Sequence, residues 1–124
     1  MASTRNLNDR MHRYAEEYRE LTAGLSETGF IWPGHIQRRY LTCGKPTCIC
    51  HTDPKARHGP YAYWTSKKDN KTVSRLLRPD EADLLEKWIT NRRTLEAVVR
   101  QMKNLSKKAA KVVLKLQEQQ KPPG

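Results

Sequence analysis

The side chains with the clearest chemistry in this chain are three cysteines and a histidine. Cys43, Cys48 and Cys50 lie within eight residues of one another, and His58 follows in the same segment. Three thiolates and one imidazole form a complete tetrahedral ligand set for zinc. Three thiols grouped this closely, with histidines beside them, are not typical of an ordinary core. The pattern therefore predicts a zinc ion that stabilises the fold.

The fourth ligand is open among three histidines. His51 directly follows Cys50, and adjacent side chains seldom point at one ion, which favours His58. His58 also precedes Gly59-Pro60, a turn that leads into an expected strand, so a metal there would join two strands. His35 is the third candidate. Spacing alone does not select the metal, and an iron–sulfur cluster is the alternative to zinc.

We do not expect this metal to be catalytic. A catalytic zinc keeps one coordination position open for water and needs an acid or base nearby. Four protein ligands leave no such position, and Asp53 is the only acidic residue within the loop. No base and orienting group accompany the thiols as they would in a nucleophilic site. The pattern therefore favours a non-enzymatic protein.

The expected ligands lie in a segment, residues 30–79, that is typical of strands and loops. Three short runs are rich in aromatic and β-branched residues: Ile36–Thr42, Tyr61–Thr65 and Thr72–Leu77. The tight turn Lys68-Asp69-Asn70-Lys71 separates the last two runs and predicts a hairpin. We expect an antiparallel sheet of about three strands in this segment.

Amphipathic helices are predicted on both sides of the sheet, over residues 1–29 and 80–120, and residues 121–124 are expected to be a frayed tail. Apolar residues of the first helix recur at alternating spacings of four and three, at Leu7, Met11, Tyr14, Tyr18, Leu21 and Leu25. Pro79 suits the first position of the second helix. Its seam keeps the same spacing for more than four heptads, through Leu84, Trp88, Asn91, Leu95, Val98, Met102, Leu105, Ala109, Val112 and Leu116.

The two seams differ in length. At about 1.5 Å per residue, the second seam is about 48 Å long and the first about 27 Å. The first helix would leave part of the second uncovered, so we expect a homodimer that pairs through residues 95–116. A helix break at Ser106 would fold the last part back and is the alternative.

Positive charge is concentrated in the middle segment, which carries ten basic and two acidic residues. An antiparallel ribbon of this charge fits the major groove of DNA, where Arg and Lys contact phosphates or guanine edges. The candidate nucleic-acid contacts are Arg38, Arg39, Lys67, Lys68, Lys71, Arg75 and Arg78. Among the aromatic residues, we expect Tyr61 and Tyr63 in the core and Trp64 exposed for stacking on bases.

Composition limits the setting in which this chain works. It has 124 residues and a net charge of +11, and Leu, Ile, Val and Phe together number only 22. So few large apolar residues favour stabilisation by a metal or by oligomerisation. No apolar run approaches the ~18 residues of a membrane span, and no signal-like segment opens the chain. We expect a cytoplasmic protein with reduced cysteines and no membrane partner.

Two motifs resemble those of a known family. Cys43-Gly44-Lys45-Pro46-x-Cys48-x-Cys50 and His58-Gly59-Pro60-Tyr61-x-Tyr63 are similar to the pattern of small bacterial and archaeal proteins of unknown function. The resemblance covers about residues 30–95, with Asn70 where the family usually has Gly. It supports His58 as a ligand, because His51 lies outside the motif. Members are often encoded near transposases, so the resemblance implies an association with DNA.

These observations predict an α+β protein in which a small zinc-stabilised antiparallel sheet is flanked by an N-terminal helix and a long C-terminal helix. Four segments are expected, over residues 1–29, 30–79, 80–120 and 121–124. We expect a non-enzymatic accessory protein that binds double-stranded DNA and serves a transposase or recombinase. The alternative is a protein-interaction adaptor that dimerises through its C-terminal helix.

Overall fold

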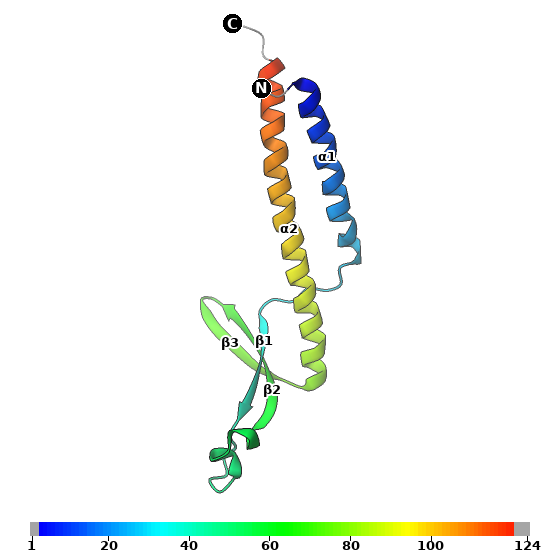
Figure 1. Cartoon of the computed structure of the whole chain (residues 1–124). Helices are drawn as coiled ribbons and strands as arrows, with labels where there is room; N and C mark the ends of the chain where they lie inside the picture. Colours follow the sequence, from blue (N-terminus) through cyan, green and yellow to red (C-terminus); the bar gives the residue numbers. More distant parts are fainter. Residues whose placement is uncertain (1–2, 121–124) are drawn as a thin grey trace. The chain divides into compact units, whose positions relative to one another are not determined.

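The computed structural model describes residues 3–120, so the tail expected at 121–124 lies outside the described part of the chain. Figure 1 shows the elements in chain order. They are helix α1 (Thr4–Ala23), the short 3-10 helix η1 (Gly24–Glu27), strand β1 (His35–Leu41), the 3-10 helices η2 (Ile49–His51) and η3 (Pro54–Ala56), strands β2 (His58–Lys68) and β3 (Lys71–Leu77), and helix α2 (Pro79–Gln120). The α+β fold predicted from the sequence is confirmed.

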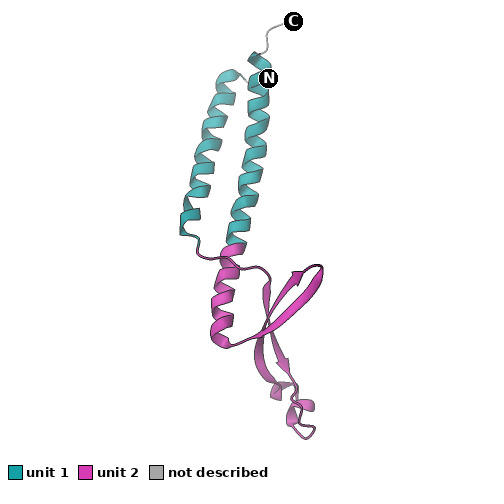
Figure 2. Ribbon diagram, turned by 180° about the vertical axis from the view of Figure 1, so that it is seen from behind, with its two compact units in different colours: residues 1–28, 93–124 teal, residues 29–92 magenta. Residues whose placement is uncertain are grey.

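The chain divides into two compact units, which Figure 2 distinguishes by colour. Unit 1 comprises residues 1–28 and 93–124, and unit 2 comprises residues 29–92. Helix α2 contributes its first part to unit 2 and its remainder to unit 1.

Unit 1 is a pair of helices whose apolar seams bury only a few residues. The side chain of Ser3 caps α1 by accepting the Asn6 backbone N–H at 3.1 Å, as N-capping serines do. Leu7 of α1 and Leu105 and Val112 of α2 are buried. Helix α2 continues without interruption past residue 106, so the alternative of a break there is wrong.

Unit 2 contains the antiparallel sheet in the order β1-β2-β3. Strands β2 and β3 form the predicted hairpin, and its two turn residues, Asp69 and Asn70, have φ of 53° and 63°. Two positive φ values are the geometry of the tight hairpin turn that matches strand twist, and Asp and Asn tolerate it better than most residues. Strand β2 begins earlier than predicted, at His58, and so includes Pro60. The strand tolerates this proline because it lies at an irregularity in the β1–β2 ladder, where its missing N–H costs no regular hydrogen bond.

One face of the sheet packs on the first turns of α2. The buried cluster is Ala62, Leu77 and Ala82, and Ile36, Trp64 and Leu85 pack against it. The expectation that Trp64 is exposed is therefore wrong. Its indole N–H donates to the Pro33 carbonyl at 2.8 Å, whereas Tyr61, expected in the core, is exposed.

The start of α2 also departs from its predicted seam. Leu84 is 49% exposed, and Ala82 and Ile89 are buried instead. In these turns the helix packs on the sheet through the face that contains Ala82. The heptad spacing continues on another face, which contains Leu84. The heptad pattern could not reveal this change of partner.

The segment between η1 and β1 is fixed to α2 by aromatic contacts and by hydrogen bonds to its carbonyls. Trp32 lies 5.8 Å from Trp64 and 6.3 Å from Trp88 between ring centroids. Asn91, the one polar member of the predicted seam, donates to the Phe30 carbonyl at 2.9 Å. Arg92 donates to the Trp32 and Gly34 carbonyls, each at 3.1 Å. Asn91 therefore has a structural partner within unit 2.

Candidate metal centre

The β1–β2 ladder brings the two halves of the cysteine–histidine motif together. Leu41 pairs with His58 across the ladder, and Cys43 follows two residues after the end of β1. The Cys-rich connection from β1 to β2 therefore leaves and re-enters the sheet beside the same point. This loop, residues 42–57, is called the Cys loop below.

Short local hydrogen bonds fold the Cys loop into two turns. The Cys48 N–H donates to the Lys45 carbonyl at 3.1 Å, and the Cys43 N–H donates to the Cys50 sulfur at 3.3 Å. Asp53, the acidic residue of the loop, caps η3 by accepting the Lys55 backbone N–H at 3.0 Å. Its carboxylate therefore has a structural role in the turn.

The ligand atoms of Cys43, Cys48, Cys50 and His58 all lie within 4.8 Å of one another. The Cys50 and Cys43 sulfurs are 3.7 Å apart, and the Cys48 sulfur is 3.6 Å from His58 Nε2. With Zn–S near 2.3 Å and Zn–N near 2.0–2.1 Å, a regular tetrahedron has edges of about 3.8 Å between sulfurs and about 3.6 Å between sulfur and nitrogen. Both separations therefore fit a single four-coordinate ion.

The three cysteines are free thiols. A disulfide would need its sulfurs about 2.05 Å apart, far closer than the 3.7 Å between Cys43 and Cys50. Cys50 is only 2% exposed, whereas Cys43 and Cys48 are partly exposed. The cluster is thus closed on the Cys50 side and reachable from solvent on the other, which suits a bound cation.

The surroundings of the thiols affect Cys48 and Cys50 in opposite directions. A hydrogen bond from the Cys50 backbone N–H, followed by contacts with His58 and the other two thiols, lowers the pKa of Cys48 to about 6. The Cys43 N–H likewise favours the Cys50 thiolate, yet burial and the neighbouring thiols outweigh it and raise the pKa of Cys50. One thiolate is thus favoured by the loop itself, and a bound cation would favour ionisation of the others.

The structure separates the three candidate histidines. His58 lies in the cluster, whereas the His51 imidazole Nε2 lies 2.9 Å from the Lys45 carbonyl oxygen, which turns it to the backbone of its own loop. His35 is at the opposite end of β1, paired with Thr65. The preference for His58 over His51 and His35 agrees with this placement.

Gly59 explains why the residue after His58 in the motif is a glycine. Its φ is +131°, and a Cβ there would lie 2.7 Å from the Arg39 carbonyl oxygen. Residues other than glycine rarely adopt this φ value, and the Arg39 carbonyl belongs to backbone that cannot easily move away. The glycine lets β2 approach β1 closely at the residue that presents the imidazole.

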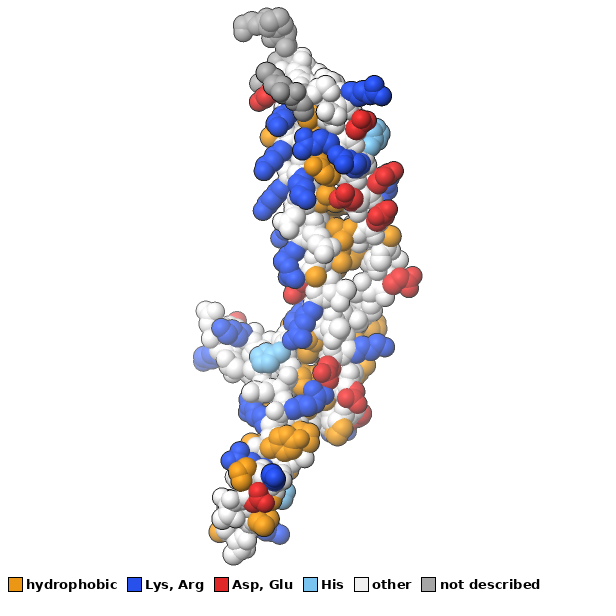
Figure 3. Space-filling view, in the orientation of Figure 1, with side chains coloured by type: hydrophobic (Ala, Val, Ile, Leu, Met, Phe, Trp, Pro, Cys, Tyr) orange, Lys and Arg blue, Asp and Glu red, His pale blue; other side chains and the backbone are white. Residues whose placement is uncertain are grey.

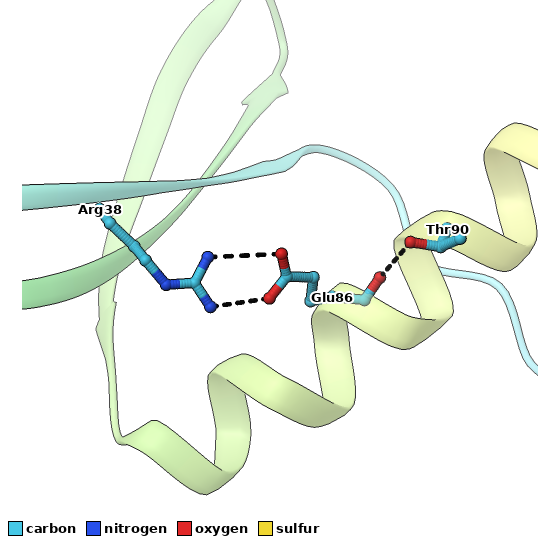
Figure 4. Close-up of polar contacts among 3 residues, drawn as sticks. All are labelled: Arg38, Glu86 and Thr90. Atoms are coloured by element: carbon cyan, nitrogen blue, oxygen red, sulfur yellow. Dashed lines mark hydrogen bonds and ion pairs between the residues drawn. The ribbon is translucent and has the colours of Figure 1, made fainter.

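The candidate nucleic-acid contacts do not form one surface. Arg38, Arg75 and Arg78 face the start of α2 and form ion pairs with its acidic residues. Arg38 donates two hydrogen bonds to the Glu86 carboxylate, the shorter at 2.7 Å, and Figure 4 shows this bidentate pair. The pair raises the pKa of the Arg38 guanidinium, because the charged form is the one that Glu86 stabilises.

The other two arginines of this group pair with the first turn of α2. Arg75 lies 3.6 Å from Glu81, and Arg78 lies 3.3 Å from Glu81 and 3.5 Å from Asp80. Sequence reasoning missed these partners, because acidic residues at a helix start are already expected from the helix dipole. Alternation along the strands would place Arg38 and Arg75 on definite faces, but it does not show which face α2 covers.

Arg39, Lys67, Lys68 and Lys71 form no ion pair within residues 3–120. Arg39 lies on the face away from α2, and the three lysines surround the β2–β3 turn. Figure 3 shows basic side chains at this hairpin and along α2. These four residues are the part of the predicted set whose charge is not matched by an acid.

None of the described helices has the length and apolar character that crossing a membrane requires. No curated protein and no solved structure matches this chain. A family model described as a domain of unknown function (DUF6788) matches residues 4–87, which is more than half of the chain and includes the whole Cys loop. The chain therefore belongs to the DUF6788 family.

Proposed function

We propose that this protein is a non-enzymatic DNA-binding accessory protein whose sheet is stabilised by zinc. The observation that carries the proposal is the separation of charge in unit 2. Three acids at the start of α2, Asp80, Glu81 and Glu86, form ion pairs with Arg38, Arg75 and Arg78, whereas the three lysines of the hairpin form no ion pair within residues 3–120. These lysines are Lys67, Lys68 and Lys71. A cluster of unmatched cations at the end of a two-stranded ribbon suits the phosphates of a duplex.

Zinc is the metal that the ligand set supports best. Common iron–sulfur clusters are held by four thiolates, and this chain has three cysteines. Three sulfurs and one imidazole nitrogen lie within 4.8 Å of one another, and the Cys43–Cys50 and Cys48–His58 separations match those of a tetrahedral zinc site. With all four positions taken by protein, the ion has none left for water, which supports a structural role.

The role of the hairpin follows from its reach. Lys67, Lys68 and Lys71 flank the turn and are exposed, so they can approach backbone phosphates on both sides of a groove. Such contacts set position and affinity more than sequence preference. An accessory role beside a transposase or recombinase is supported by the resemblance to proteins encoded near such genes.

Salt dependence of DNA binding tests this proposal. Replacing Lys67, Lys68 and Lys71 with Ala should weaken binding to any duplex and flatten the plot of log affinity against log salt by about one unit per lost phosphate contact. Zinc content should not change. The matched control replaces three exposed lysines of α2, Lys103, Lys107 and Lys111, which should alter duplex affinity much less.

Two outcomes would overturn the assignment. If the hairpin variant binds DNA as the wild type does and the α2 control loses affinity, the DNA surface lies on the helix. If the wild type binds duplex DNA no better than an unrelated basic protein, the DNA-binding function itself is wrong. The adaptor function would then stand, since unit 1 has an apolar hollow of about 370 Å³ lined by Met11, Tyr14, Leu105 and Ala109 among others.

A further inference from the structure

The sheet has one face that α2 does not cover, and this face carries aromatic and aliphatic side chains. Cross-strand pairs place Arg39 opposite Tyr61, Gln37 opposite Tyr63, and Tyr63 opposite Leu76. Directly paired residues lie on the same face, and it is the face opposite the Ala62–Leu77–Ala82 cluster. We call Gln37, Arg39, Tyr61, Tyr63 and Leu76 the open face.

The middle of the open face is less polar than a surface exposed to water usually is. The solvent side of an antiparallel sheet is normally polar. Here Leu76 is 56% exposed and Tyr61 is 40% exposed, and Tyr63 lies between them in the register. Apolar side chains exposed next to one another are a feature of interaction sites, whereas scattered ones are normal.

Arg39 packs on one of the two tyrosine rings of the open face. Its guanidinium lies 4.8 Å from the centroid of the Tyr63 ring and donates a hydrogen bond to Gln37 Oε1 at 2.7 Å. The guanidinium group is planar, and in this position it keeps further N–H donors for a ligand. Tyr61 and Tyr63 lie two residues apart on β2, about 6.8 Å along the strand. Separate flat ligand groups can therefore stack on the Tyr61 ring and on the Arg39–Tyr63 pair.

The charge of the open face indicates which kind of ligand it can bind. The positions that extend this face along the strands, 35, 65, 67, 72 and 74, carry His, Thr, Lys, Thr and Ser, so the face has no acidic residue. The acids that pair with sheet arginines all belong to α2, on the other side. A ligand that combines flat apolar rings with negative charge fits this face.

We infer that the open face binds a single-stranded nucleic acid, with unpaired bases stacked on Tyr61 and on the Arg39–Tyr63 pair and phosphates near Arg39 and Lys67. The inference rests on the proposed DNA-binding function and deepens it, because it adds a site for unpaired bases to the phosphate contacts of the hairpin. Base stacking on aromatic side chains accepts any sequence, since every base has a π face.

Fluorescence anisotropy with three probes tests the inference. The probes are an oligodeoxyuridylate, an oligouridylate of the same length, and a blunt duplex. Replacing Tyr61 and Tyr63 together with Ala should weaken single-strand binding about tenfold or more, which corresponds to the usual energy of stacking. The same variant should retain duplex binding, and the double Phe variant should bind single strands as the wild type does.

A pair of matched charge variants guards against a change in folding. Leu76→Glu places an acid on the open face, and Leu84→Glu places the same acid on α2 at a leucine of similar exposure. Leu76→Glu should weaken single-strand binding, whereas Leu84→Glu should not. Zinc content and tryptophan emission, measured on each variant, confirm that unit 2 is folded.

The outcomes separate this inference from the function on which it rests. Loss of binding to either single-stranded probe in the Tyr61→Ala, Tyr63→Ala variant supports it, and the two probes show whether the sugar matters. If the wild type binds duplex DNA while both the Tyr61→Ala, Tyr63→Ala variant and the Leu76→Glu variant bind single strands as tightly as it does, the inference is wrong. The DNA-binding function of the hairpin is then unaffected. If the wild type binds no nucleic acid, both fail together.

Discussion

At the scale of single residues, the candidate metal centre depends on which way two neighbouring imidazoles point. His58 begins β2 opposite Leu41, so the ladder holds its ring beside the Cys48 sulfur at 3.6 Å. His51 ends η2, and its Nε2 lies against the Lys45 carbonyl oxygen of the same loop. The strand therefore supplies a fixed ligand, whereas the 3-10 turn directs the other histidine away.

This difference predicts unequal effects of two alanine variants. His58→Ala should release zinc at lower chelator concentration and destabilise unit 2, because three thiolates and a water hold the ion less well than a full protein set. His51→Ala loses only a contact with the Lys45 carbonyl at the surface, so its effect on zinc should be small. Zinc retention is measured by a chelator competition with a colorimetric dye.

The His51 variant is the matched control, since it removes an imidazole from the same loop. Equal zinc retention in the two variants would contradict the assignment of His58. A greater loss of zinc from the His51→Ala variant than from the His58→Ala variant would show that the ion is held by another set of ligands.

At the scale of elements, the sheet has little apolar material of its own. Its buried cluster consists of two alanines and one leucine, supported by Ile36, Trp64 and Leu85. Two such alanines bury little area, and apolar burial contributes only about 25 cal/mol for each Å² removed from water. A metal that joins the Cys loop to the start of β2 would supply what this core lacks, because structural zinc in small domains binds with an apparent energy of about 10–16 kcal/mol.

Removal of the metal should therefore unfold the sheet as well as loosen the loop. All three tryptophans, Trp32, Trp64 and Trp88, lie in unit 2, so tryptophan emission reports on this unit alone. We expect a strong chelator to shift the emission to longer wavelength, while the far-ultraviolet signal of the helices changes less. Adding zinc back should reverse the shift.

The tryptophans lie toward the start of β1, away from the Cys loop, so their emission responds only if disorder spreads through the sheet. If zinc leaves and the emission does not change, the sheet is stable without the ion, and its role is not structural. Elemental analysis of the purified protein gives the metal content before and after treatment.

At the scale of the whole molecule, unit 1 has more apolar surface than a pair of helices covers. A hollow of about 370 Å³ lies between α1 and α2, lined by Met11, Tyr14, Leu105 and Ala109 among others. Leu114 is 60% exposed near the end of α2. Helices with partly open seams commonly complete a bundle with further helices.

We therefore expect a homodimer that forms through residues 95–116 of α2 together with α1. Light scattering at micromolar concentration should give twice the chain mass of 14.4 kDa. Ala109→Glu places a charge in the hollow and should shift the protein toward the monomer. Leu84→Glu, in unit 2, adds the same charge away from the hollow and should leave the mass unchanged.

A wild type of single-chain mass at this concentration would show that α1 alone is a sufficient partner for α2. A dimer that both variants leave intact would place the interface elsewhere in the chain.

Local patterns in the sequence determined the elements and the candidate ligands. The spacing of four and three predicts both helices, and runs of β-branched and aromatic residues predict the three strands. The cysteine spacing and the Gly-Pro turn after His58 favour the ligand set that the structure brings together. These features are local because each depends on the geometry of one helix, strand or turn.

Only the tertiary structure decided which face of each element is covered. Trp64 and Tyr61 exchange their expected places, because the start of α2 packs on the Trp64 side of the sheet. The same choice matches Arg38 with Glu86 and leaves Arg39 without an acid. Alternation along a strand defines two faces but not which one a distant helix will cover, since that depends on the total burial of the assembled unit.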